Sequence, residues 1–203
     1  MTIIETGYRF FHVIDSEDFL KAWRPLRSFC VSPVGIGLAG CEHQEESIPL
    51  ALAELHQRAV SGDAAAQLDL GLRYVTGRGI HADERAALNW IGKAAAQGNP
   101  AAQFELGSYY TLAPHLDFGR AVDWLRQAAL QGFAPAQTSL AMLYLAGTGV
   151  AEDRIEAYAW LGLAAEQGER DALDRVPDVQ AGLSDAEREQ ARQRAHRYRQ
   201  GSL

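Results

Sequence analysis

One block of residues recurs three times along this chain, about 35 residues apart, and this repetition constrains the fold more than any other feature. Each copy begins with a glycine and reaches an Ala-Gln pair a few residues later. The copies are Gly62–Gln67, Gly98–Gln103 and Gly132–Gln137. Units of this length bury their apolar faces only against their neighbours. The sequence therefore predicts a stack of like units.

Each unit is predicted to contain two antiparallel helices. In the first half of a unit, apolar residues recur at the spacing of one helix face, as at Leu70 and Tyr74. In the second half, alanines recur at the same spacing around a tryptophan. We therefore expect an all-α fold, in which large rings fill the space between layers. The tryptophans expected to be largely buried are Trp90, Trp124 and Trp160.

Turn and cap residues mark the joints between the predicted helices. Gly77 and Gly147 suit the left-handed backbone that follows many helix ends. Asp83 and Asp153 then stand where a side chain would cap the next helix. The middle unit has a shorter connection without this glycine pattern.

The repeats divide the chain into three regions. The N-terminal arm covers residues 1–47, the solenoid residues 48–176, and the C-terminal capping helix residues 177–203. Within the solenoid, a leading half repeat at 50–61 precedes repeats at about 62–97, 98–131 and 132–167.

Two signals mark the end of the solenoid. Pro177 is expected to end a short helix near Val176, because proline lacks the N–H that a helix interior needs. Ser184 and Glu187 form a capping box that begins the last helix, which runs to about Gln200. That helix is polar, as the open end of a stack of repeats requires.

The most specific pattern resembles a known family. Leu70–Asp83 reads Leu-Gly-x-x-Tyr-x-x-Gly-x-Gly-Ile-x-x-Asp and is followed by Trp90–Gly98, and the same pattern returns in Leu140–Asp153 and Trp160–Gly168. It resembles the Sel-one-like repeat, a relative of the tetratricopeptide repeat. The resemblance implies a right-handed α-solenoid of antiparallel helix pairs. It also implies a non-catalytic scaffold or adaptor that binds a peptide or partner protein in a concave groove.

Two alternatives to a plain adaptor stay open. One is an envelope-anchored lipoprotein that assists secretion or cell-wall processes, since members of the resembled family often act outside the bacterial cytoplasm. The other is a cell-wall or β-lactam hydrolase, since some cysteine-rich members are linked to β-lactam binding. This chain has only two cysteines and lacks a pair in each repeat, which argues against the second alternative.

Helix phase and the resemblance together predict a binding face. With Leu70 and Tyr74 facing inward, the positions near 68, 69 and 72 point away from the core, and in the resembled family that side lines the groove. The predicted partner-binding residues are Leu68, Asp69, Leu72, Phe104, Glu105, Ser108, Thr138 and Met142. The apolar ones would form an exposed ladder flanked by acids, which is typical of a partner site. The alternative is that the N-terminal arm or the last helix covers them.

Phe104 is the central residue of this predicted face. As a surface residue outside the repeat contacts, its replacement by serine should change the free energy of unfolding by about 0.5 kcal/mol or less. As an anchor, it should contribute about 2 kcal/mol or more to partner binding.

The N-terminal arm contains a second motif. Lys21, Arg24 and Arg27 precede an apolar stretch that ends in Leu38-Ala39-Gly40-Cys41, and a polar segment follows. This order resembles a bacterial lipoprotein signal, which implies lipidation of Cys41 and a location in the periplasm or outer membrane. The acidic residues near the start of the chain favour the alternative, a cytoplasmic protein with an N-terminal arm.

Composition and motifs argue against several other functions. With 19 Lys and Arg against 26 Asp and Glu, the net charge of −7 offers little attraction to a phosphate backbone, so nucleic acid is not expected as a partner. The six histidines lack metal-ligand spacing, and neither a phosphate-binding loop nor a nucleophile elbow occurs. We expect no catalytic residue, no metal and no cofactor, and any contact with a membrane only through a lipid at Cys41.

Overall fold

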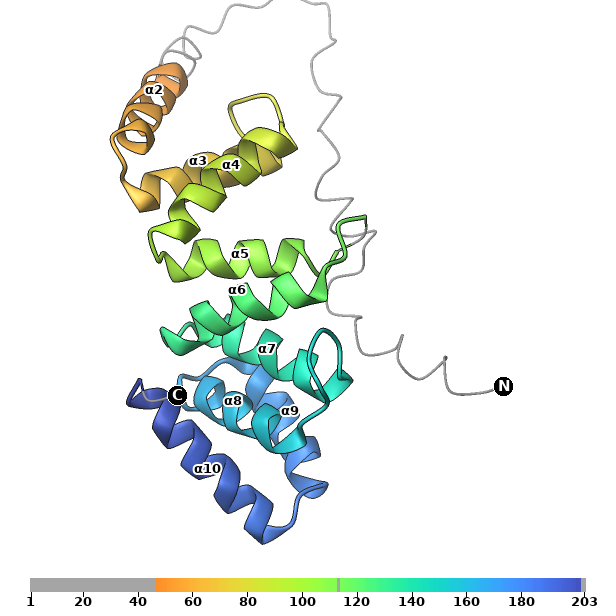
Figure 1. Ribbon diagram of the computed structural model, residues 1–203. Coiled ribbons are helices and arrows are strands. Elements are labelled where there is room, and N and C mark those ends of the chain that lie inside the picture. Colours follow the sequence, from red (N-terminus) through yellow and green to blue (C-terminus); the bar gives the residue numbers. More distant parts are fainter. Residues whose placement is uncertain (1–46, 113, 202–203) are drawn as a thin grey trace, which may run out of the picture. The chain divides into compact units, whose positions relative to one another are not determined.

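The computed structural model describes residues 47–112 and 114–201, and within these ranges the regular secondary structure is entirely helical (Figure 1). The helices are α2 (Ser47–Val60), α3 (Ala64–Thr76), α4 (Glu84–Ala96), α5 (Pro100–Tyr109), α6 (Phe118–Leu130), α7 (Ala134–Ala146), α8 (Arg154–Glu166), α9 (Arg170–Ala181) and α10 (Asp185–Arg199). The all-α class predicted from the repeats is confirmed. The N-terminal arm and Cys41 lie outside the described residues.

The described helices belong to two compact units, divided between Trp90 and Ile91 within α4. In the first unit, α2 and α3 pack together around a small core. The buried residues of this core are Leu55, Ala59, Ala66 and Leu70. The helix α2 therefore covers the segment in which the sequence predicts a helix before the first full repeat.

In the second unit, α5 to α9 pack one after another in chain order, and α10 returns to pack on α8. Their shared core combines alanines with a few larger residues, and Ala121, Ala128, Ala136 and Ala157 are fully buried. A methyl group at these contacts lets two helices approach closely, while larger side chains fill the space beside it. The small-residue columns seen in the sequence are therefore the contact lines between helices.

A buried glutamine explains why each repeat opens with an Ala-Gln pair. The side-chain amide of Gln67 donates to the carbonyl of Ala59 at 3.0 Å, in the last turn of the preceding helix. Gln103 and Gln137 make the same bond to Ala95 and Ala129. Each of these carbonyls also accepts from the backbone amide of the glycine that follows the helix, so the glutamine is its second donor. The bond satisfies the buried glutamine amide and joins the start of one helix to the end of the preceding one.

A backbone hydrogen bond closes each helix hairpin. The amide of Asp153 donates to the carbonyl of Tyr144 at 3.1 Å, and its side chain caps α8 by accepting from the Glu156 amide. The middle repeat makes the same closure from Asp117 to Tyr110 at 2.9 Å, although its connection is shorter. Closure therefore depends on the tyrosine and aspartate columns and not on the length of the turn.

The glycines of the longer turns have a steric role. Gly149 has φ +72°, and a Cβ there would overlap the backbone of Phe118 at the start of α6. Only glycine fits both the left-handed backbone and this close approach.

Two expectations about individual elements are wrong. Pro177 lies inside α9, which continues to Ala181. Proline is exposed there, while Val176 and Val179 on the neighbouring helix positions pack against the core. This packing holds the helix through a residue that would end a helix lacking tertiary contacts.

The second wrong expectation concerns the tryptophans. Trp160 is 1% exposed, but Trp90 and Trp124 are only half-buried. The difference comes from α10, because the ring of Tyr198 stacks on Trp160 with centroids 4.3 Å apart. Equivalent positions in a repeat array thus differ in burial when a terminal helix covers one of them.

The polar terminal helix itself is confirmed. Ser184 caps α10 and forms the predicted capping box with Glu187. Among the residues described, no helix is both long enough and apolar enough to cross a bilayer.

Burial predicts a graded response to tryptophan truncation. Trp160→Ala should lower the free energy of unfolding by about 3–5 kcal/mol, as for a fully buried aromatic residue. Trp124→Ala should cost less, about 1–2 kcal/mol, because its ring is partly solvated already. Chemical denaturation of both variants measures the difference, and equal losses would contradict the burial described here.

Candidate functional site

The predicted binding residues on α3 lie on its outward side. Leu68 and Leu72 are half-buried and Asp69 is exposed. The Asp69 carboxylate forms an ion pair with Arg73, with Oδ1 3.2 Å from Nε, one helical turn further on. Arg73 was not among the predicted residues, although its i,i+4 spacing from Asp69 is a recognisable signal.

In the second unit, Phe104 and Thr138 contact residues that follow their own helix pair, which was not predicted from the sequence pattern. The rings of Phe104 and Phe133 lie 5.4 Å apart, and Phe104 is half-buried against the core. Thr138 is buried and donates a hydrogen bond of 2.9 Å to Glu169. Thr138 is therefore a contact between repeats, and its predicted exposure is wrong.

Phe104 also differs from the expectation of a surface residue. Its ring packs beside Phe133, so Phe104→Ser would remove apolar contacts and cost more than the 0.5 kcal/mol or so of an ordinary surface substitution. A signal for this contact exists in the sequence. The residue before the first helix is a polar cap at Asp63, Asn99 and Glu169, but Phe133 makes no side-chain cap bond.

The remaining predicted residues of the second unit keep an outward position. Glu105 and Ser108 on α5 and Met142 on α7 are half-buried, so each offers part of its side chain to solvent. Burial raises the pKa of the Glu105 carboxyl above its ordinary value. Among the described residues, no cation forms an ion pair with Glu105. We call Phe104, Glu105, Ser108 and Met142 the first-helix face.

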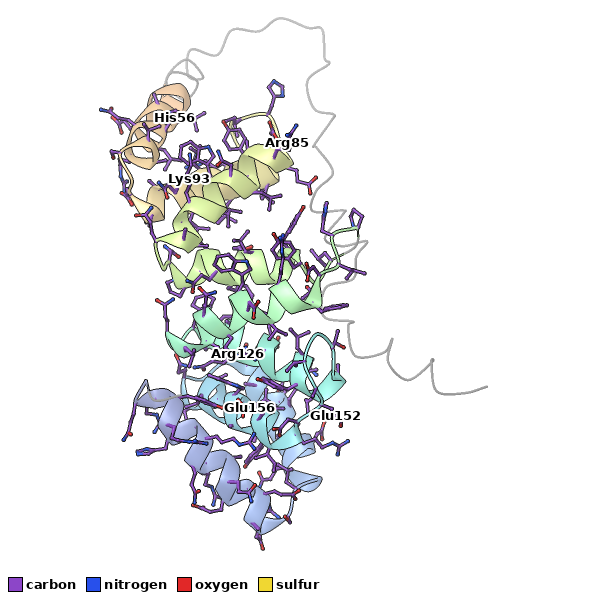
Figure 2. All side chains as sticks on the ribbon, in the orientation of Figure 1. His56, Arg85, Lys93, Arg126, Glu152 and Glu156 are labelled. Carbon is purple, nitrogen blue, oxygen red and sulfur yellow. The ribbon has the colours of Figure 1, made fainter. Side chains whose placement is uncertain are left out.

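A second polar cluster joins α8 to α10 and was not foreseen (Figure 2). Glu156 is buried, and its carboxylate accepts from Trp160 at 2.9 Å, from Arg194 at 2.8 Å and from Tyr198 at 2.5 Å. Arg194 also binds Asp153 at 2.7 Å. Arg194 and Tyr198 lie about 40 residues from their partners on α8 in sequence, so no local pattern indicates that they meet.

In this cluster two carboxylates share one guanidinium, that of Arg194. Burial opposes ionisation of Asp153, but the hydrogen bond and charge of Arg194 outweigh it and hold the pKa of Asp153 below its ordinary value. Burial and the bond to Glu156 raise the pKa of Tyr198. Two carboxylates do meet here, yet both are bound to Arg194. The cluster fastens α10 to the stack and does not resemble a pair of carboxylates poised for hydrolysis.

Metal ligation finds no support within residues 47–112 and 114–201. No group of three or more His, Cys, Asp or Glu side chains gathers there in a way that could hold an ion.

Comparison with known proteins matches the repeats. A family model for the Sel1 repeat matches residues 64–99, 100–133 and 134–169, each beginning close to the start expected from the sequence. The chain is similar to a Sel1 repeat protein from Oxalobacter formigenes, whose crystal structure matches with 37% identity and a TM-score of 0.60. That match covers 63% of this chain and 98% of the other.

A second similar structure is a protective antigen present in uropathogenic Escherichia coli strains, which displays an SLR fold. The two share 41% identity with a TM-score of 0.58, over 60% of this chain. The matched region is only 26% of that longer chain.

The raised pKa of Glu105 yields a stability prediction. A carboxyl whose pKa is higher in the folded than in the unfolded state destabilises the fold at pH values above the unfolded pKa, and this penalty vanishes as the pH falls below it. Glu105→Gln should therefore raise the melting temperature at pH 7, and the gain should disappear below about pH 4.

Thermal melts across this pH range test it, with Asp69→Asn as the matched control. Asp69→Asn removes one member of an ion pair and should show no such gain. A lower melting temperature for Glu105→Gln at pH 7 would mean that the carboxylate stabilises the fold.

Proposed function

The chain belongs to the Sel1 repeat family, and on that premise we propose that it is a non-catalytic adaptor that binds a peptide or a segment of a partner protein on its first-helix face. The resemblance seen in the sequence is thereby confirmed. Members of this family generally serve as scaffolds for protein–protein interaction. The identity of the face and the nature of the partner are the parts that we propose.

One observation carries the proposal. The stack uses the inward columns of α5 and α7 for packing, since Leu106, Gly107, Leu140 and Ala141 are buried. It leaves Glu105, Ser108 and Met142 half-exposed on the other side, without a packing role in the core cluster. A mixed face of this kind, apolar in part and rimmed by polar groups, suits a protein partner.

The overall charge supports the same class of partner. A net charge of −7 disfavours a phosphate backbone and favours a protein that presents basic groups.

Blocking the face tests this function. Ser108→Arg places a large side chain on a half-exposed position without removing a core contact, so it should leave the melting temperature nearly unchanged. It should weaken binding of the partner by about 2 kcal/mol or more, roughly thirtyfold in Kd. The partner is first captured from a lysate with the full chain, and its Kd is then measured with purified proteins.

The control adds the same side chain elsewhere. Gln190→Arg lies on the exposed side of α10 and should bind the partner as the wild type does. If Ser108→Arg binds the partner with unchanged Kd, the first-helix face is not the binding site.

We also propose that Cys41 carries a lipid that anchors the protein in the periplasm or outer membrane, where an adaptor could assist secretion or cell-wall processes. Support comes from the sequence alone, in the basic residues, the apolar stretch and the Leu38-Ala39-Gly40-Cys41 motif. A cytoplasmic location is the alternative.

The lipid proposal has a direct test in a native bacterial host. Cys41→Ser should move the protein from the membrane fraction to the soluble fraction, because the acyl chains supply the membrane affinity. Mass spectrometry of the wild type should find a chain that begins at a modified Cys41. An intact Met1 in a soluble cytosolic fraction would refute the anchor.

A further inference from the structure

The first helices of the repeats differ at one pair of positions, one helical turn apart. In α3, an acidic residue is followed one turn later by a base, and Asp69 and Arg73 form an ion pair. The equivalent residues of α5 are Glu105 and Tyr109. The acid is retained in the second repeat, but within residues 47–112 and 114–201 no cation forms an ion pair with it.

The partial burial of Glu105 gives this difference between repeats a cost in free energy. The Glu105 side chain is half-buried, and no cation among residues 47–112 and 114–201 forms an ion pair with it. Desolvation of an unpaired carboxylate costs free energy, and burial raises its pKa accordingly. A cation from another molecule would be attracted to this acid more strongly than to a fully solvated one, because the effective dielectric constant is lower at a partly buried site.

An apolar surface lies next to this acid on the same helix. Phe104 precedes Glu105 in α5, and its half-buried ring lies 5.4 Å from that of Phe133. Both rings are only partly covered. A partner segment that carries a cation beside an apolar side chain would therefore be complementary to this surface. The cation would meet Glu105, and the apolar side chain would meet the two phenylalanine rings.

Resting on the proposed function, we propose that the first-helix face recognises a lysine or arginine side chain of the partner, whose cationic group pairs with Glu105 while a neighbouring apolar side chain packs on Phe104 and Phe133. The partner is thus a basic, partly apolar peptide segment. The charge of the chain is complementary to such a segment.

Peptide pools test this recognition with the full chain. Three fluorescent pools carry Lys, Gln or Glu at a fixed central position, with flanking positions randomised among Leu, Phe, Ser and Gly. The wild type should bind the Lys pool about fivefold more tightly than the Gln pool, as expected for one partly buried ion pair. Glu105→Gln should reduce this preference to less than about twofold, and Glu105→Lys should favour the Glu pool.

Asp69→Asn is the matched control, because Asp69 already has its cation within the chain. It should keep the preference of the wild type for the Lys pool. NMR of the Glu105 carboxyl gives an independent readout, since its pKa should fall when the Lys pool binds.

The outcomes separate this inference from the proposed function. A preference for the Lys pool that persists in Glu105→Gln overturns the inference, as does the absence of any such preference in the wild type. If Ser108→Arg still blocks all three pools in that case, the first-helix face remains the binding site. If Ser108→Arg changes neither pool binding nor partner binding, the proposed function itself is wrong.

Discussion

The stack depends on one recurring hydrogen bond, in which a buried glutamine amide closes the end of the preceding helix. A buried side-chain amide left without an acceptor costs about 1–3 kcal/mol. Gln137 donates to the carbonyl of Ala129 in the preceding repeat and accepts a bond of 2.9 Å from Gln167 at the end of its own repeat. Gln103 likewise accepts from Gln131 at 2.7 Å. The helix ends on both sides therefore satisfy the polar atoms of each buried glutamine.

The same bond explains where the regular array ends. The residue of α9 at the glutamine column is Leu173, which is 51% exposed and cannot donate a hydrogen bond to a helix end. The last helix, α10, then packs on α8 through the Glu156 cluster instead of extending the array. A buried carboxylate held by three donors is costly to disrupt, since removal of its cation would leave an unpaired charge. The array thus ends at the Glu156 cluster, which holds α10 against α8 and so also buries Trp160.

Binding and stability make different demands on α5 and α7. The inward columns hold alanine, glycine and leucine, which the close contacts require. The outward columns are free of this requirement and vary between repeats, as Asp69, Glu105 and Ser139 show. Glu105 is half-buried and forms no ion pair in the described part of the chain, so it does not stabilise the stack. Functional sites often retain a group of this kind at a cost in stability. The difference between repeats therefore carries more information about the partner than the features they share.

The sequence by itself determined the helix pairs, their spacing, the caps at Asp83, Asp153 and Ser184, and the family. These features depend on interactions within one repeat or between neighbouring repeats, so periodicity and local chemistry are sufficient to predict them. The outward positions of Glu105, Ser108 and Met142 followed from the same helix phase. Only the tertiary structure decided that α9 continues through Pro177, that Thr138 is buried, that Trp160 is more buried than Trp124, and that Glu156 meets Arg194 and Tyr198. Each of these depends on where a helix distant in sequence comes to lie, and that position is set by packing across the whole unit, which no local pattern contains.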